Sequence, residues 1–165
     1  MKDQITPSPF TTRPVHPDDL PVICGFPQNQ MELFYLYPKA TFPLTVDQLQ
    51  SSIEQRVEST VLIVDSKVAG FANFYRWEPG IVCTIGNVVV SPAVRGKGAG
   101  QFLIRAMIKI AKEKYHVSAV QLSCFNINTY ALFFYSRLGF KPYGFEERID
   151  PYGNPIISIH MTMNV

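Results

Sequence analysis

The feature that most constrains this chain is a strand pattern that runs into a glycine-rich loop and then into an amphipathic helix. Three β-branched residues, Val88–Val90, indicate a buried strand, and Pro92 ends it because proline cannot extend a ladder of hydrogen bonds. Gly96, Gly98 and Gly100 follow, and glycines let a backbone approach a ligand closely. The helical periodicity that comes next places a helix start directly behind the glycines.

The loop and the helix start together predict a site for an anion. A helix N-terminus leaves several backbone N–H groups without partners and has partial positive charge. Behind a glycine-rich loop it suits a phosphate group, and Arg95 and Lys97 add charge beside it. The loop does not end in Gly-Lys-Ser/Thr and does not match Gly-x-Gly-x-x-Gly, so neither common nucleotide motif is present. An ordinary strand-to-helix turn remains the alternative for the loop alone.

Composition excludes several classes of protein. The chain has 165 residues, of which 47% are hydrophobic and 17% charged, so we expect one globular domain over residues 1–165. A net charge of +2 without a long basic run argues against nucleic-acid binding. No apolar segment approaches the roughly 18–20 residues of a membrane span, and no signal-peptide core is evident. Cys24, Cys83 and Cys124 lack metal-ligand spacing, so we expect reduced thiols, no metal and a cytoplasmic location.

Hydrophobic periodicity predicts strands and helices that are mixed along the chain. Strands are expected over residues 10–15, 60–64, 68–77, 81–90, 117–124, 140–149 and 156–163. Helices are expected from 16 to 24, over 28–37, after the capping-box pattern Thr45-Val46-Asp47-Gln48, after Gly100, and from Asn126 or Asn128 to Leu138. This order predicts a mixed α/β (α+β) fold with helices packed on a central sheet.

Two motifs resemble the GCN5-related N-acetyltransferase (GNAT) family. Arg95-Gly96-Lys97-Gly98-Ala99-Gly100 resembles the family's [Arg/Gln]-x-x-Gly-x-[Gly/Ala] loop, and the strand before it resembles the family's fourth strand. Further along, the chain reads Asn128-x-x-Ala131-x-x-x-Tyr135-x-x-x-Gly139-Phe140, which resembles the second signature. The resemblance implies a mostly antiparallel twisted sheet of six or seven strands, splayed at an acyl-CoA site, with helices on both faces.

The resemblance also implies acetyl-CoA or a related acyl-CoA as co-substrate, and it assigns residues to it. For the pyrophosphate they are Arg95, Gly96, Lys97, Gly98, Ala99 and Gly100, and for the pantetheine arm the backbone of Val88 and Val90. Asn128 resembles a position that contacts the cofactor, and Tyr135 the tyrosine that protonates the departing CoA thiolate. Asn128 as a helix cap and Tyr135 as a core residue are the plainer alternatives.

The implied reaction is attack by a primary amine of a small molecule or peptide on the thioester. Backbone N–H groups can stabilise the tetrahedral oxyanion, and a phenol can protonate the thiolate. The amine must first lose a proton, but no carboxylate lies between Ile81 and Val90, where many family members carry a glutamate. The sequence therefore leaves the general base unassigned. Cys124 lies near the expected acetyl group, and packing is the favoured role for it.

Two other functions stay open. The missing carboxylate suggests a non-catalytic acyl-CoA-binding sensor or interaction module on the same fold, and the glycine loop alone permits a nucleotide-binding regulator. The acceptor is not identified by the sequence. By resemblance, the segment with Phe34, Tyr35, Tyr37 and Phe42 walls its site, although aromatic residues of this kind are more often core residues. Glu146, Glu147 or Asp150 could attract an amine, or they could simply keep an edge strand soluble. A homodimer through the C-terminal strands is plausible for the family.

Overall fold

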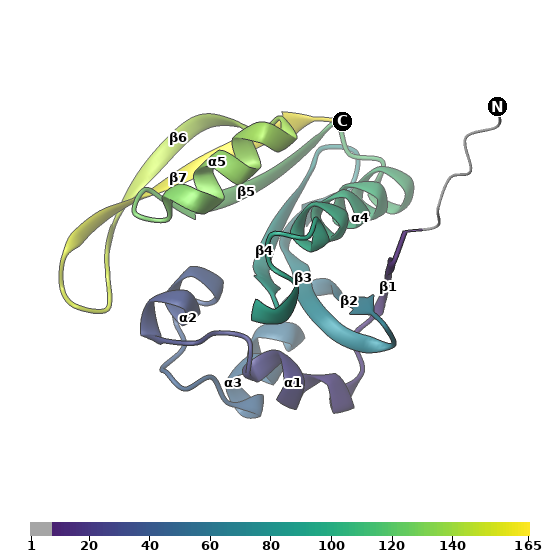
Figure 1. The fold of residues 1–165 in the computed structure, drawn as a ribbon. Coiled ribbons are helices and arrows are strands. Elements are labelled where there is room, and N and C mark those ends of the chain that lie inside the picture. Colours follow the sequence, from purple (N-terminus) through teal and green to yellow (C-terminus); the bar gives the residue numbers. More distant parts are fainter. Residues whose placement is uncertain (1–7) are drawn as a thin grey trace.

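The computed structural model describes residues 8–165, and in this part of the chain seven strands form one sheet with five α-helices packed against it (Figure 1). The strands are β1 (Phe10–Pro14), β2 (Val57–Val64), β3 (Lys67–Glu78), β4 (Val82–Val90), β5 (Ala119–Phe125), β6 (Lys141–Ile149) and β7 (Pro155–Asn164). The helices are α1 (Leu20–Cys24), α2 (Gln30–Leu36), α3 (Val46–Glu54), α4 (Ala99–Tyr115) and α5 (Thr129–Leu138), with short 3-10 turns η1 (Pro17–Asp19) and η2 (Pro92–Val94). The predicted mixed fold is confirmed.

The sheet opens between β4 and β5. Its strand order is β1-β2-β3-β4-β5-β7-β6, and every neighbouring pair is antiparallel except β4 and β5. Those two strands pair at three positions, the last of which joins Thr84 to Gln121. Beyond it, β4 continues to Val90 and β5 to Phe125 without pairing to each other. The predicted splay is therefore present, and it lies at the end of β4 that leads into the glycine loop.

The helices cover both faces of the sheet, as expected. Leu62 of β2, Phe74 of β3 and Leu103 of α4 belong to one buried cluster, which also includes residues of α5. The neighbouring Val61 of β2 points to the opposite face, where it joins Leu33 of α2 and residues of α1 and α3. In Figure 1, α4 and α5 lie over one side of the sheet and α1 to α3 gather on the other.

A β-bulge bends β4 just beyond its last pair with β5. Asn73 of β3 faces Gly86, whereas Phe71 faces Val89, so β4 contains one extra residue in this interval. Asn87 lies within the bulge and has a φ of 50°, a conformation that asparagine tolerates better than most residues. Because a bulge increases local bending and twist, it turns the end of β4 away from β5.

Buried hydrogen bonds hold Asn87 in this conformation. Its Oδ1 accepts hydrogen bonds from Ser52 Oγ at 2.7 Å and Asn73 Nδ2 at 3.0 Å. Its Nδ2 donates to the backbone carbonyl of Leu36 at 2.9 Å. Asn87 is 4% exposed, so these bonds replace contacts with water and connect β4 to α3, β3 and the end of α2.

Some local features differ from the sequence predictions. The strand expected from residue 60 already begins at Val57. The predicted capping box is half formed: Thr45 Oγ1 accepts from the Gln48 N–H, but the Gln48 side chain bonds to the backbone of Thr41 instead of to that of Thr45. The periodicity after Gly100 predicts an apolar stripe that includes Leu103 and Met107, and Ile104 beside this stripe is fully buried as well. Within residues 8–165, no helix has both the length and the apolar character that crossing a membrane requires.

Candidate active site

A cavity of about 600 Å³ lies between the glycine loop, the end of β4 and α5; we call it the loop cavity. Most of the predicted site residues line it, namely Val88, Val90, Arg95, Gly96, Gly98, Gly100, Asn128 and Tyr135. Two predicted residues do not. Lys97 Nζ donates to the carbonyl of Ala93 at 3.1 Å, and Ala99 is packed in the core at 1% exposure. The fold thus brings together two motifs that are separate in the sequence.

The backbone of the loop presents N–H groups at the start of α4. Gly96 and Gly98 have φ values of 73° and 86°, which side chains other than glycine rarely adopt. The amides of Arg95 to Gln101 have no hydrogen-bond acceptor in residues 8–165. Free amides at the positive end of a helix dipole form a surface for anions.

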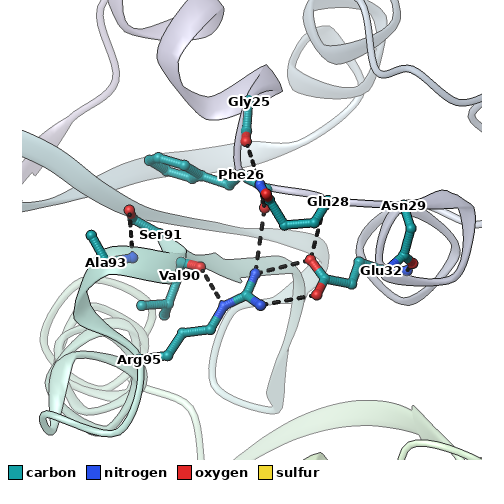
Figure 2. A network of polar contacts seen from close by, with 9 residues as sticks. All are labelled: Gly25, Phe26, Gln28, Asn29, Glu32, Val90, Ser91, Ala93 and Arg95. Carbon is teal, nitrogen blue, oxygen red and sulfur yellow. Dashed lines mark hydrogen bonds and ion pairs between the residues drawn. The ribbon is translucent and has the colours of Figure 1, made fainter.

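The Arg95 side chain ties this loop to α2 (Figure 2). Its Nη1 and Nη2 donate to the two carboxylate oxygens of Glu32 at 2.9 and 3.0 Å, and its Nε donates to the carbonyl of Val90 at 3.1 Å. A longer bond of 3.4 Å joins Nη2 to the carbonyl of Phe26. The hydrogen bonds from Arg95 hold the pKa of Glu32 below its ordinary value. The guanidinium is thus engaged within the protein, and the backbone N–H of Arg95 remains for an anion.

A second cavity, of about 740 Å³, lies on the other side of the opening between β4 and β5; we call it the hairpin cavity. The β6–β7 hairpin and β5 supply Ser123, Glu146, Arg148 and His160, and the opposite wall supplies Tyr37, Lys39, Arg56 and Tyr75. Six residues line both cavities: Tyr35, Leu36, Val88, Asn128, Ala131 and Tyr135. The two cavities therefore meet at the splayed end of β4.

Tyr135 lies at this junction. It is 8% exposed and packs against Phe134 and Phe140, and no group in residues 8–165 hydrogen-bonds to its hydroxyl. Burial raises the pKa of Tyr135 well above its ordinary value, so the phenol stays protonated at neutral pH. A protonated hydroxyl without a protein partner can donate to a group that enters from either cavity.

The sequence of the chain matches the acetyltransferase (GNAT) family over residues 26–140. The chain belongs to the GNAT family.

Solved structures show the same fold over nearly the whole chain. A GCN5-related N-acetyltransferase from Kribbella flavida is 26% identical, with a TM-score of 0.75 and coverage of 97% of this chain and 100% of that one. The ribosomal-protein-S18-alanine N-acetyltransferase from Escherichia coli is 21% identical, with a TM-score of 0.73 and coverage of 94% of both chains. A search of curated protein sequences gives no match. The resemblance drawn from the two motifs is confirmed.

Asn128 and Cys124, whose roles the sequence leaves open, have clear structural roles in this GNAT chain. Asn128 caps α5, because its Oδ1 accepts from the Ala131 N–H at 3.3 Å, and it also lines both cavities. Cys124 is buried, and burial raises the pKa of its thiol to about 12. A thiol that stays protonated is a poor nucleophile, so the expected packing role fits.

The hairpin cavity contains polar side chains that the sequence analysis did not connect. Ser123 Oγ and His160 Nδ1 are 2.8 Å apart, and His160 Nε2 lies 3.9 Å from Glu146 Oε2. Glu146 also accepts a hydrogen bond from Arg148 at 2.9 Å. The pairing of β5 with β7 sets Ser123 opposite His160, a register that was not evident in the sequence.

The acidic residues expected near an acceptor separate into two groups. Glu146 lines the hairpin cavity, whereas Glu147 and Asp150 are not among its lining residues. The carboxylate of Asp150 accepts from the backbone N–H groups of Tyr152 and Asn154, each at 2.8 Å. Asp150 therefore shapes the β6–β7 turn, and Glu146 is the carboxylate of the three that faces the cavity.

Proposed function

We propose that this protein transfers an acetyl group from acetyl-CoA to a primary amine of a small molecule or peptide by direct attack. The observation that carries the proposal is the junction of two cavities at the opening of the sheet, with Tyr135 on the lining of both. The donor occupies the loop cavity, and the amine approaches from the hairpin cavity. The reacting carbon then lies at the splayed end of β4.

The loop cavity suits the phosphates and the pantetheine arm of the donor. The free amides after Arg95 bind the pyrophosphate, and the pantetheine lies along the part of β4 that does not pair with β5. The carbonyl of Val90 already accepts a hydrogen bond from Arg95 Nε. We therefore assign the first backbone contact with the pantetheine to Val88. The N–H of Val90 provides a second contact beside it.

The chemistry follows from these positions. The amine lone pair attacks the thioester carbon, and the carbonyl oxygen becomes an oxyanion that backbone N–H groups at the splay stabilise. The intermediate collapses as the C–S bond breaks and an amide forms. Tyr135 gives its proton to the departing thiolate and regains one from water, so that free CoA is released.

His160 is the proposed acceptor of the proton that the amine loses. When His160 Nδ1–H donates to Ser123 Oγ, the lone pair of Nε2 is directed away from β5 and is available to a base-catalysed step. Glu146, with its carboxylate 3.9 Å from Nε2, stabilises the imidazolium that results. This assignment supplies the base for which β4 has no carboxylate.

Separate measurements of acetyl-CoA binding and of turnover test this proposal. Acetyl-CoA should raise the melting temperature of the protein, because it binds only the folded state, whereas ATP and NAD should not. CoA release, followed with a thiol reagent, should depend on an amine in a panel of amino acids, polyamines and short peptides. Stabilisation by acetyl-CoA without turnover on any amine would favour the non-catalytic module, and stabilisation by ATP or NAD alone would favour a nucleotide-binding regulator.

A further inference from the structure

We infer that the acceptor carries an anionic oxyacid group, a carboxylate or a phosphate ester, and that Arg56 binds it. The inference rests on the proposed function, because it assigns the hairpin cavity to the acceptor. It adds the class of acceptor, an amine with an anion on the same molecule, and a residue that selects it.

Neighbouring groups hold the Arg56 side chain in the wall of the hairpin cavity. Its Nη1 donates to Asn73 Oδ1 at 3.1 Å, and its guanidinium lies 5.4 Å from the ring centre of Tyr75. Gly86 leaves the space for this arrangement, since a Cβ there would lie 2.6 Å from both Arg56 Nη1 and Tyr75 Cδ1. A guanidinium held by an amide and an aromatic face is pre-organised to bind an anion through its remaining N–H groups.

Arg56 differs from the other arginines, because each of those is exposed and four of them also pair with a carboxylate. Arg13, Arg76, Arg95 and Arg148 each pair with a carboxylate, and the unpaired Arg105 and Arg137 are exposed to solvent. Arg56 is half-buried, and no carboxylate in residues 8–165 forms an ion pair with it. Its loss of contact with water also lowers the pKa of the guanidinium. A half-buried charge without a counter-ion is costly, and an anionic ligand would remove that cost.

The charge balance of the hairpin cavity points to the same ligand. Glu146, the lining carboxylate, already accepts a hydrogen bond from Arg148. Lys39 lines the same wall as Arg56 and, within the described residues, has no ion pair either. The cavity therefore retains two cations, while His160 and Glu146 lie on the hairpin side. An acceptor that places its amine at the junction and its anion near Arg56 finds a suitable partner for each of these two groups.

Matched ligands test the inference. The probes are N-acetylated amino acids with a free carboxylate, their carboxamides, N-acetyl-O-phosphoethanolamine and N-acetylethanolamine, each added with CoA to the full-length protein. We expect each anionic product to bind more tightly than its neutral partner, as measured by thermal shift and calorimetry. The acetylation rates of the corresponding amines should follow the same order, and the two anionic series distinguish a carboxylate from a phosphate.

Variants assign the preference to Arg56. Arg56→Gln should weaken binding of the anionic probes roughly 10- to 100-fold, the range for loss of a charged hydrogen bond, and leave the neutral probes unchanged. Arg56→Lys should restore part of the loss, because a lysine keeps the charge without the fork. Arg76→Gln is the matched control, since Arg76 is exposed and outside both cavities.

Three outcomes would overturn the inference. They are equal affinity for anionic and neutral probes, no binding of any anionic probe at millimolar concentration, and a preference that survives in Arg56→Gln. Acetyl-CoA binding by Arg56→Gln shows that the variant is folded. If acetyl-CoA binds the wild-type protein but the anionic preference is absent, the inference fails while the proposed function stands. If acetyl-CoA itself does not bind, the proposed function fails.

Discussion

At the scale of single residues, the hydroxyl of Tyr135 is the proposed general acid, and its buried position permits a direct test. Tyr135→Phe removes a buried hydroxyl without a protein partner, so we expect little change in stability. We expect kcat to fall by about 100-fold, the lower end of general acid catalysis, with donor affinity unchanged. Steady-state kinetics and acetyl-CoA calorimetry measure the two effects. Tyr152→Phe, at an exposed turn, is the control, and an unchanged kcat in Tyr135→Phe would remove the acid role.

His160 gives a second prediction for a single residue. His160→Gln should lower kcat roughly 100-fold at neutral pH, because no side chain then accepts the proton that the amine must lose. Raising the pH should restore part of the rate, since more of the amine is already neutral in solution. A purely structural role would lower the rate equally at all pH values. His16→Gln is the control, because His16 lies outside both cavities and at the start of η1.

The residues that could be found from sequence are those whose signal is local. Tyr135 and Asn128 stand at fixed positions on one helix, so the second motif identified them. Arg56 and Glu32 could not be found in this way, because each meets its partner through the fold: Arg56 contacts Asn73 on a neighbouring strand, and Glu32 meets Arg95 across the mouth of the loop cavity. Such pairs cannot be recognised from the spacing of residues in a single sequence.

At the scale of elements, we propose that the glycine loop binds the donor through its backbone, and two matched glycines test this proposal. Gly98 and Gly153 have φ values of 86° and 87°, and a Cβ on either would meet nothing closer than 3.9 Å. Gly98→Ala and Gly153→Ala should therefore destabilise the protein alike, by roughly 1–2 kcal/mol for a left-handed residue. Gly98→Ala should also weaken acetyl-CoA binding, whereas Gly153→Ala should not, as measured by calorimetry. Equal donor affinities would refute the loop as the donor site.

The elements were predictable, but the opening between them was not. The valines before Pro92 and the capping asparagine before α5 are strong local signals, and both elements form where they are expected. The end of pairing at Thr84 has no such signal, and neither has the bulge at Asn87 that follows it. Asn87 lies in a run of strand-forming residues, and its bonds to α3 and the end of α2 appear once those elements pack. The splay was expected only because of the family resemblance.

At the scale of the whole molecule, the core between the sheet and α4 and α5 retains protons that the unfolded chain would lose. Burial is the main cause of the raised pKa values of four groups in this core. It raises the pKa of Cys83 to about 11 and the pKa values of Cys124 and Tyr115 to about 12. It also raises the pKa of Tyr135 well above its ordinary value. In the unfolded chain the thiols have a pKa near 9.0 and the phenols near 10.0. Above pH 9 the unfolded state thus binds fewer protons than the native state, so the free energy of unfolding falls as the pH rises.

This stabilisation is fully present below pH 9 and should be lost progressively toward pH 12, the range set by these groups. Urea unfolding under reducing conditions, repeated from pH 7 to 11, measures it as a slope. Tyr135→Phe should make the slope shallower only above about pH 10, where a free tyrosine begins to ionise. Tyr152→Phe is the control, because the Tyr152 side chain is exposed at the β6–β7 turn and outside this core. A free energy of unfolding that stays constant from pH 9 to 11 would mean that water reaches these thiols and phenols in the native core.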